Sequence, residues 1–547
     1  MYLKEAFVPV THYDIIDRLN GQYEKLLASG DYQPFTYPFG TLGATVVILY
    51  LLLDHRSRPW LRKARFAAWA FITIFAIWNI KSFRARNPAG AFGVGLISAW
   101  SILWCFMMLV VKDVQQDFSR IERKESRLDM ISASAPPQTA ESNGQASGSA
   151  SAYQSGSTLH NRTSKVGTKQ SPAQRTGTLA WQSYPSAPFV ERLDWVADIF
   201  SNFRGMGWNW RISGLPSPPL WAQAQLAGNL GAPPPEEDEK KTLVSRTGVH
   251  RYHDKSSLLR VNLWIFCRDV VILDIIKTLI SHDAYFWDGN VSATPNYFPA
   301  SLQASAVTVR SARLLLSLTA IYTALQAIFA LGPLFFVGMI GPRYIGVRGE
   351  IWMYPDSFGS FSNVLDKGLA GWWGGWWHQT FRYAFEAPSS KLMELLKINP
   401  KSATGKFLGL TVAFVLSGML HACGSYTQLG HTYPLSGPFL FFVSQIGGIS
   451  AQLALISFLR RIGVVQRSPK WLQRMANFVY VHVWFYYTAP LLCDDFARGG
   501  IWLFEPLPVS PLRGLGLGGK GDGFWCWWGG IVRWHKGDRW WNTGLAL

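Results

Sequence analysis

The stretch GWWGGWWHQTFR, residues 371–382, leads through a lysine-marked loop to the apolar run FLGLTVAFVLSGMLHAC, residues 407–423. Extended back to Thr404, the second stretch is long enough for a helix that crosses a membrane. Its one strongly polar, titratable member is His421. Ionisable groups at membrane depth are costly and tend to mark function. We therefore interpret His421 as the candidate catalytic base, held and supplied by the rest of the chain.

The composition is that of a membrane protein. Of the 547 residues, 15% are aromatic and only 16% are charged, whereas about a quarter of the residues in soluble proteins are charged. The net charge of +18 comes from Lys and Arg in short clusters beside apolar runs, where they orient membrane spans. We expect an all-α, polytopic transmembrane helical bundle whose partner is the lipid bilayer and not a nucleic acid.

Apolar runs predict the spans of this bundle. We expect about seven to nine spans together with interfacial helices. The clearest runs are residues 37–53, 66–80, 89–111, 314–340, 404–423, 438–459 and 476–492. No internal repeat is visible, which argues against the symmetric halves that are common in transporters.

Changes in composition divide the chain into five parts. We expect N-terminal transmembrane helices at 1–112, a basic and low-complexity disordered cytoplasmic linker at 113–190, an amphipathic RGMGWNW segment with an acidic linker at 191–257, the membrane core at 258–495, and a Trp- and Gly-rich interfacial tail at 496–547. The linker is predicted to be disordered because it carries too few large aliphatic residues to bury a core.

Residues 193–210 have apolar positions at helical spacing. This pattern predicts an amphipathic helix on or against the membrane region. Trp208 and Trp210 follow a glycine turn, and we expect them in the headgroup zone.

Residues 258–280 are apolar but carry the charged side chains of Arg268, Asp269, Asp274 and Lys277. They form either a helix buried in the bundle, with Asp274 paired to Lys277, or an interfacial amphipathic helix. The pattern leaves both interpretations open.

Two glycosylation sequons test the predicted orientation. The N-V-S sequon at Asn290 should be lumenal and available for N-glycosylation, whereas the N-R-T sequon at Asn161 should be cytoplasmic and unmodified.

An apolar chamber suits a histidine that acts as a base, because such surroundings keep the imidazole neutral. A neutral imidazole takes the proton of an alcohol while the oxygen attacks an activated acyl group. No Asp or Glu adjoins His421, so an orienting partner has to come from another segment. His378 is the nearest candidate in the chain, as a second catalytic residue.

The residues around His378 suggest how an acyl carrier is held. The forked donors of Arg382 suit the phosphates of coenzyme A, and tryptophan rings suit an adenine or an acyl chain. The residues that we expect to contact substrate or acyl-CoA are Trp373, Trp376, Trp377, Gln379 and Arg382. Alternatively, the tryptophans form an interfacial belt and Arg382 is a cytoplasmic anchor.

Other functions remain open at this point. A polytopic transporter without acyl transfer activity would use His421 and the charged residues of 258–280 to line a path. A membrane prenyltransferase would need paired aspartates, and the chain has one adjacent pair. We expect no metal site, since the spacing of His421, Cys423 and His431 matches no common ligand pattern. His482 is the main rival to His421 as the functional histidine.

Several motifs occur together from residue 193 onward: RGMGWNW, ILDIIKTLISHDAYFW, WWGGWWHQTFR, a helix ending in SGMLHA, and YVHVWFYYTAP. This combination resembles the fungal wax-synthase-like branch of the membrane-bound O-acyltransferase superfamily. The resemblance implies a multi-pass enzyme of the endoplasmic reticulum that transfers an acyl group from acyl-CoA, acetyl-CoA included, to a hydroxyl, with no bound cofactor. The family's catalytic histidine corresponds to His421, and the last polar position of its F-W-G-x-x-W-[NH] motif corresponds to His378.

This chain departs from the family at the tryptophan motif. Relatives commonly carry an acidic residue before the motif and two arginines after it, whereas this chain has Gly371, Gly375 and Trp376. The departure leaves the carrier-phosphate contacts open and indicates a changed acceptor. The resemblance implies a lipophilic terpenoid, polyketide or long-chain alcohol; the sequence specifies neither the alcohol, nor the acyl chain, nor the oligomeric state.

Overall fold

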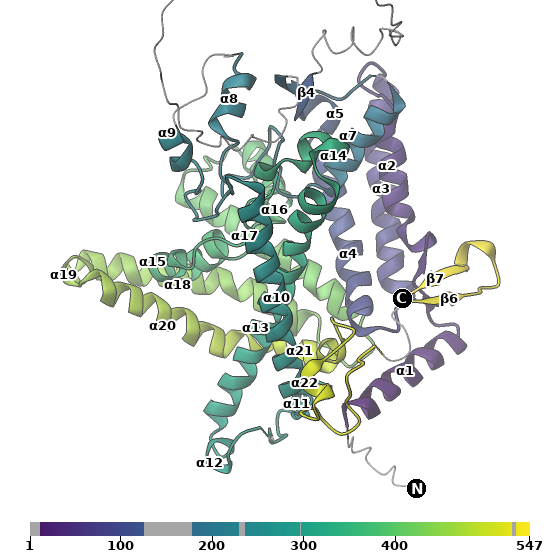
Figure 1. The fold of residues 1–547 in the computed structure, drawn as a ribbon, viewed down its shortest axis with the longest axis vertical. Helices are drawn as coiled ribbons and strands as arrows, with labels where there is room; N and C mark the ends of the chain where they lie inside the picture. The colour runs from purple at the N-terminus through teal and green to yellow at the C-terminus, as the bar shows by residue number, and fades with distance from the viewer. Residues whose placement is uncertain (1–10, 125–177, 187, 229–235, 296, 528–531) are drawn as a thin grey trace, which may run out of the picture.

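The structure is a computed structural model that describes residues 11–124, 178–186, 188–228, 236–295, 297–527 and 532–547 (Figure 1). Most of these residues are helical. The N-terminal helices are α1 (His12–Ala28), η1 (Phe39–Thr41), α2 (Leu42–Leu52), α3 (Pro59–Ser82), α4 (Pro88–Phe106), η2 (Met107–Val111) and α5 (Val114–Asp117). The central helices are α7 (Phe189–Ser201), α8 (Leu220–Leu226), α9 (Glu236–Lys241), α10 (Lys255–Ile280), α11 (Tyr285–Asp288), α12 (Ala300–Gln303), α13 (Ala306–Pro333), η3 (Leu334–Ile340), α14 (Pro342–Ile345), η4 (Gly346–Gly349) and η5 (Ile351–Met353). The remaining helices are α15 (Ser362–Gly371), η6 (Trp372–Trp376), α16 (Arg382–Leu395), α17 (Ala403–Tyr426), η7 (Leu435–Phe439), α18 (Leu440–Arg461), α19 (Val464–Arg467), α20 (Lys470–Thr488), α21 (Pro490–Gly499), η8 (Ile501–Leu503), α22 (Pro511–Gly514) and η9 (Trp540–Asn542).

Short strands add three small sheets, which the expectation of an all-α fold did not include. Strand β1 (Gln33–Pro34) pairs in parallel with β3 (Phe83–Arg84), β4 (Arg120–Lys124) pairs with β5 (Thr178–Gln182), and β7 (Gly544–Ala546) lies between β2 (Thr36–Tyr37) and β6 (Arg533–His535). Each sheet joins segments that are far apart in the sequence.

Within the described ranges, four helices are long and apolar enough to cross a membrane. They are Pro88–Val111, Ala306–Ile340, Ala403–Tyr426 and Leu435–Arg461. These confirm four of the predicted spans. The run at 37–53 forms only the short apolar helix Phe39–Leu52, and the run at 476–492 is interrupted where α20 ends and Pro490 begins α21. The expected seven to nine spans are therefore not confirmed.

Helix α17 is held against α4 by small residues. A Cβ atom at Gly95 would lie 1.9 Å from the carbonyl oxygen of Cys423, so only glycine allows this approach. The hydroxyl of Thr427 accepts a hydrogen bond from the Gly95 amide at 3.1 Å and donates one to the Ala91 carbonyl at 2.7 Å. This close contact fixes the end of α17 that carries His421.

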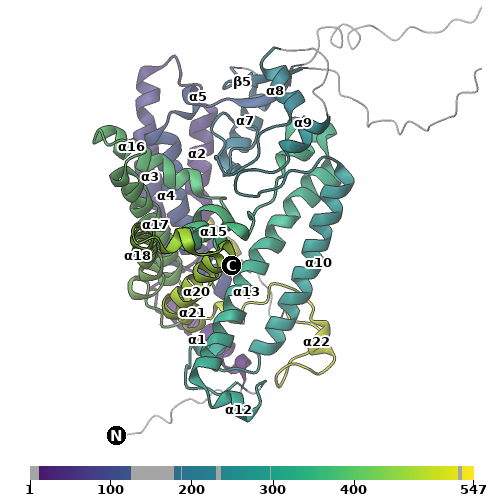
Figure 2. The same ribbon diagram turned by 90° about the vertical axis from the view of Figure 1, so that its left-hand side faces the viewer.

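Helices α10 and α13 lie side by side along the long axis of the molecule (Figure 2). The regular helix α13 ends at Pro333 and continues as the π-helical segment η3. The predicted pairing of Asp274 with Lys277 is wrong. Asp274 accepts hydrogen bonds from Ser510 and the Leu512 amide, while Lys277 pairs with Glu505 at 3.2 Å.

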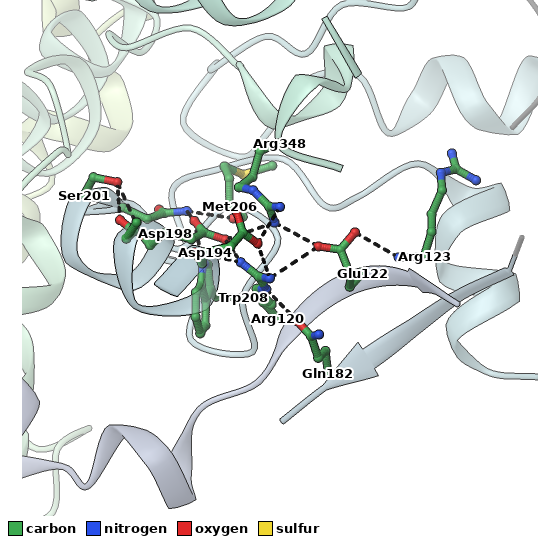
Figure 3. A network of polar contacts seen from close by, with 12 residues as sticks. Arg120, Glu122, Arg123, Gln182, Asp194, Asp198, Ser201, Met206, Trp208 and Arg348 are labelled. Carbon is green, nitrogen blue, oxygen red and sulfur yellow. Dashed lines mark hydrogen bonds and ion pairs between the residues drawn. The ribbon is translucent and has the colours of Figure 1, made fainter. Parts of the chain in front are cut away.

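The ends of the predicted disordered linker are ordered. Its first residues form α5 and β4, and residues 178–182 form β5; the segment 125–177 lies outside the described residues. A polar network holds the β4–β5 pair to α7 and η4 (Figure 3). Arg120 contacts Asp194 at 2.6 Å and Asp198 at 3.2 Å, and Arg348 contacts Asp194 at 2.7 Å. The linker prediction is therefore wrong at both ends, because paired charges stabilise strands that composition did not reveal.

The amphipathic helix of the RGMGWNW segment is confirmed as α7, which packs against α2. The expected headgroup position of the tryptophans that follow it is wrong. Trp208 and Trp210 are 3% and 7% exposed and belong to the core. The Trp208 ring lies 5.0 Å from that of Trp195, and its indole N–H donates to Asp198 at 3.4 Å. Aromatic packing and this bond draw both rings inward.

Candidate active site

A cavity of about 1410 Å³ occupies the middle of the structure. Its walls come from α4, α10, α13, η6, α16, α17 and α18, and from residues 501–507. Along α17 the lining runs from Gly405 to His421, which corresponds to about 24 Å at the rise of an α-helix. The polar or charged side chains in the lining, tryptophans aside, are Lys277, His378, Gln379, Arg382, Glu386, Ser389, Ser390, Lys406, Ser417 and His421. We call this cavity the chamber.

His421 faces the chamber with a defined arrangement of its ring nitrogens. Nδ1 lies 2.8 Å from the carbonyl oxygen of Ser417, one turn earlier on α17. A carbonyl oxygen only accepts, so Nδ1 carries the hydrogen and Nε2 keeps its lone pair. The ring packs on Phe442, with centroids 4.2 Å apart. The imidazole is therefore oriented for accepting a proton at Nε2.

His482 makes the same local contact in a different place. Its Nδ1 lies 2.8 Å from the carbonyl oxygen of Phe478, also one turn earlier, but its side chain is exposed on α20 and is not part of the chamber lining. The hydrogen bond is thus a common feature of a helical histidine. What distinguishes His421 is the chamber that it faces.

The tryptophan motif forms a tight turn tied together by Gln379. This side chain is 5% exposed, and its Nε2 donates to the carbonyl oxygens of Trp373 at 3.0 Å and Trp377 at 2.6 Å. Its Oε1 accepts from Nη1 of Arg382 at 2.7 Å. Gln379 therefore positions the turn that carries His378 in the chamber wall.

Glycine is required at Gly375, one of the departures from the family motif. A Cβ atom there would lie 2.6 Å from Cγ of Asn363. The amide of Asn363 donates to the Thr247 carbonyl at 2.9 Å and to the Ser360 carbonyl at 2.8 Å. This buried asparagine occupies the space that a larger side chain would need.

His378 lies in the chamber wall within an aromatic cluster. Its ring centroid is 5.3 Å from that of Trp377, 5.4 Å from Phe329 and 5.7 Å from Phe381. Its Nδ1 is buried and has no hydrogen-bond partner among the described residues. A buried polar atom without a partner is costly, and such atoms call for an explanation.

Two cations of α16 and α17 line the chamber. Arg382, at the start of α16, donates to Glu386, to Gln379, and to the carbonyl oxygen of Gly374 at 3.3 Å. Lys406, exposed at the start of α17, also lines the chamber. The lining therefore offers cations beside mostly apolar side chains.

Of the predicted site residues, the chamber brings together His421, His378, Trp373, Trp377, Gln379 and Arg382. Trp376 does not line it; its ring stacks on Tyr322 with centroids 5.4 Å apart. Asn290 is exposed in the loop after α11.

Two lining or supporting residues were missed. Gln445 is fully buried, and its Oε1 accepts from the indole nitrogens of Trp373 at 3.3 Å and Trp484 at 3.2 Å. A glutamine inside the apolar run 438–459 was a sequence signal that its side chain has a polar partner in the bundle. Lys277, in the C-terminal part of α10, also lines the chamber. One interpretation of the sequence had paired it with Asp274.

The tail prediction is also wrong in its first part. Residues 496 and 501–507 contribute chamber walls, among them Phe496, Trp502 and Phe504. They are part of the body around the site and not a peripheral tail.

Comparison with known proteins agrees with the motifs. Residues 354–444 match the model of the membrane bound O-acyl transferase family. This range contains His378, His421 and the whole tryptophan turn. The resemblance to this family is confirmed, and together with the four apolar helices it indicates an integral membrane protein.

Curated relatives are fungal transferases. The chain is 27% identical to the O-mevalon transferase macI of Penicillium terrestre over 263 residues, 44% of this chain and 47% of that protein. It is 30% identical to the acetyltransferase aurG of Calcarisporium arbuscula over 173 residues, 31% of this chain and 39% of that protein. It is 24% identical to the acetyltransferase spyB of Aspergillus fumigatus over 322 residues, 54% of this chain and 46% of that protein.

The matched parts therefore span less than half the length of these relatives. No solved structure matches the chain.

Proposed function

We propose, from the similarity to the membrane bound O-acyl transferase family, that this protein transfers an acyl group from acyl-CoA to the hydroxyl of a lipophilic alcohol. The observation that carries the proposal is the orientation of His421. Its Nδ1–H is held by the Ser417 carbonyl, which leaves the Nε2 lone pair free at the wall of a large, mostly apolar chamber.

The reaction uses His421 as a general base. The alcohol gives its proton to Nε2 while its oxygen attacks the thioester carbonyl. The C–S bond then breaks, and the imidazolium returns the proton to the departing thiolate of coenzyme A. Base catalysis of this kind contributes about 10²- to 10⁴-fold to the rate. An apolar chamber favours transfer because it keeps water away from the thioester.

The donor is bound through cations that line the chamber. Arg382 on α16 and Lys406 on α17 are the candidates for contacts with the phosphates of coenzyme A. Trp373 and Trp377 line the same chamber as the two histidines, so an acyl chain bound there contacts aromatic walls. No role at the donor site is proposed for Trp376, which stacks on Tyr322 outside the chamber.

His378 assists at the acyl site. Its buried Nδ1 has no partner among the described residues, and it lines the same chamber as His421. A bound substrate hydroxyl or carrier amide would supply the missing partner. This interpretation gives a reason for a polar ring inside an aromatic cluster.

The names of the relatives suggest the kind of substrate. Two of the three relatives described above are named acetyltransferases, so acetyl-CoA is the first donor to test. We propose a terpenoid, polyketide or long-chain alcohol as acceptor, and the endoplasmic reticulum as the location, with Asn290 on the lumenal side.

The test is a transfer assay with membranes that contain the protein. Radiolabelled acetyl-CoA is supplied with mixed lipophilic alcohols, and labelled esters are extracted and separated. We expect esters only with membranes that contain the protein. Uptake of a solute into reconstituted vesicles, with no ester formed from any alcohol, would instead support the transporter alternative and refute the enzyme.

A further inference from the structure

Lys277 is one of three Lys and Arg side chains that line the chamber in the part of the chain that the structure describes, together with Arg382 and Lys406. It sits on α10, and its side chain is 11% exposed. Nζ contacts Glu505 at 3.2 Å and donates to the carbonyl oxygen of Trp502. An ammonium group has three N–H donors, so these two contacts leave one donor for a ligand in the chamber.

Glu505 does not need Lys277 as its partner. Arg513 already donates to both carboxylate oxygens of Glu505, at 2.9 Å and 2.7 Å. Two other carboxylates nearby, those of Asp274 and Asp522, also have partners other than Lys277. Asp274 accepts from Ser510 and the Leu512 amide, and Asp522 contacts His12 at 3.2 Å. Pairing with Glu505 alone therefore does not account for a lysine at this position.

The wall between His421 and Lys277 is aromatic. The ring of His421 lies 6.4 Å from that of Phe92, which lies 5.2 Å from Phe496, which in turn lies 6.0 Å from Trp502. All of these residues line the chamber. A molecule that places a hydroxyl at His421 and extends along this wall has apolar contacts until it reaches the ammonium group of Lys277.

We propose that Lys277 binds a second oxygen of the acceptor alcohol. The acceptor is then a lipophilic alcohol with a carbonyl or hydroxyl oxygen at the end remote from the hydroxyl that is acylated. This inference rests on the proposed acyl transfer and narrows its substrate class. A purely hydrocarbon alcohol leaves the third donor of a buried ammonium without a partner, which is costly.

Matched acceptors test this assignment. Straight-chain alcohols from octanol to tetradecanol are compared with keto alcohols of the same length, whose ketone lies at the far end. For the unmodified protein we expect the best keto alcohol to have a KM about tenfold lower than its plain counterpart, since a hydrogen bond to a charged group gains at least this factor. Lys277→Met should abolish the preference by raising the KM of the keto alcohol to that of its plain counterpart.

Two further variants separate recognition from structure. Lys241→Met removes an exposed lysine that pairs with Asp238 far from the chamber lining, and it should keep the preference. Lys277→Arg keeps a cation with a longer reach, so it should shift the preference toward shorter keto alcohols. If Lys277→Met does not fold, this shift remains the test.

Binding is measured in parallel without acyl-CoA, from the rise in thermal midpoint of the purified protein with each alcohol. A preference that survives Lys277→Met, or an equal loss of both acceptor types in both Lys277 variants, overturns the assignment. If keto alcohols bind in a way that depends on Lys277 but no ester is formed, the proposed acyl transfer is refuted and the assignment of Lys277 stands. Ester formation without a keto preference refutes only this inference.

Discussion

The Nδ1 atom of His421 lies 2.8 Å from the carbonyl oxygen of Ser417, and this contact determines which ring nitrogen can act as a base. Because the carbonyl takes the hydrogen on Nδ1, the lone pair is on Nε2. In the proposed mechanism, the backbone of α17 orients the imidazole as a carboxylate does in the Ser-His-Asp triad.

His421→Ala should lower kcat for acyl transfer by about 10²- to 10⁴-fold, because it removes the group that accepts the hydroxyl proton. The amount of protein in membranes should not change. His482→Ala is the matched control, since His482 makes the same 2.8 Å contact with a helix carbonyl but is exposed outside the chamber lining. Equal activities of the two variants in the ester assay would remove His421 from the mechanism.

His378→Phe should raise the stability of the protein and lower its activity. Phenylalanine keeps the ring in the aromatic cluster but removes the buried Nδ1 that lacks a partner, so we expect a stability gain of about 1 kcal/mol. We expect kcat to fall by about 10², the lower end of acid–base assistance. Thermal unfolding and the ester assay measure the two effects. A more stable variant with full activity would show that His378 is structural.

Gln379→Ala should destabilise the tryptophan turn. The substitution removes the Gln379 donor from two backbone carbonyls and one of the two acceptors of Arg382 Nη1, at a cost of about 2 to 4 kcal/mol. The thermal midpoint and kcat should fall together. Gln466→Ala serves as control, because this exposed glutamine makes a single bond to the Arg460 carbonyl; its change should stay within about 0.5 kcal/mol.

Arg382→Gln should raise the KM for acyl-CoA about tenfold and leave the KM for the alcohol unchanged, because only the donor carries phosphates. High salt should weaken donor binding to the unmodified protein more than to the variant. Arg474→Gln, which breaks a surface pair with Asp366, is the control. Equal changes in both KM values would argue against a donor site at Arg382.

The charge of Asp522 should make the stability of the protein depend on pH in the acid range. Burial raises the pKa of this carboxyl, but its contacts with His12 and the charge of Arg513 outweigh burial and hold the pKa at about 2, below the ordinary 3.8. A lowered pKa adds stability at neutral pH that is lost as the pH falls from 3.8 toward 2. Asp522→Asn should cost about 2 kcal/mol at neutral pH.

The difference in stability between the unmodified protein and Asp522→Asn should shrink in acid. Thermal unfolding across a pH series measures this difference. Asp538→Asn changes an exposed carboxylate in the same part of the chain and should have no such effect. A difference of constant size at every pH would mean that the charge of Asp522 is not what stabilises the contact with α1.

Predictions from the sequence were most reliable where one segment decides the outcome. Helix α17 and the amphipathic helix α7 follow from local patterns of apolar residues. The failures depend on partners remote in sequence. Composition did not reveal that Trp208 would be buried against Trp195, nor that β4 would pair with a strand beyond residue 177.

The sequence by itself determined that some helices are long and apolar enough to cross a bilayer and that one of them carries His421, because a helix satisfies its own backbone hydrogen bonds and needs no distant partner to be stable in lipid. The tertiary structure alone decided which polar groups share the chamber. Lys277 meets Glu505 and Gln445 meets two tryptophans only after helices from separate parts of the chain have packed together. Such contacts depend on three-dimensional proximity, which spacing along the chain does not encode.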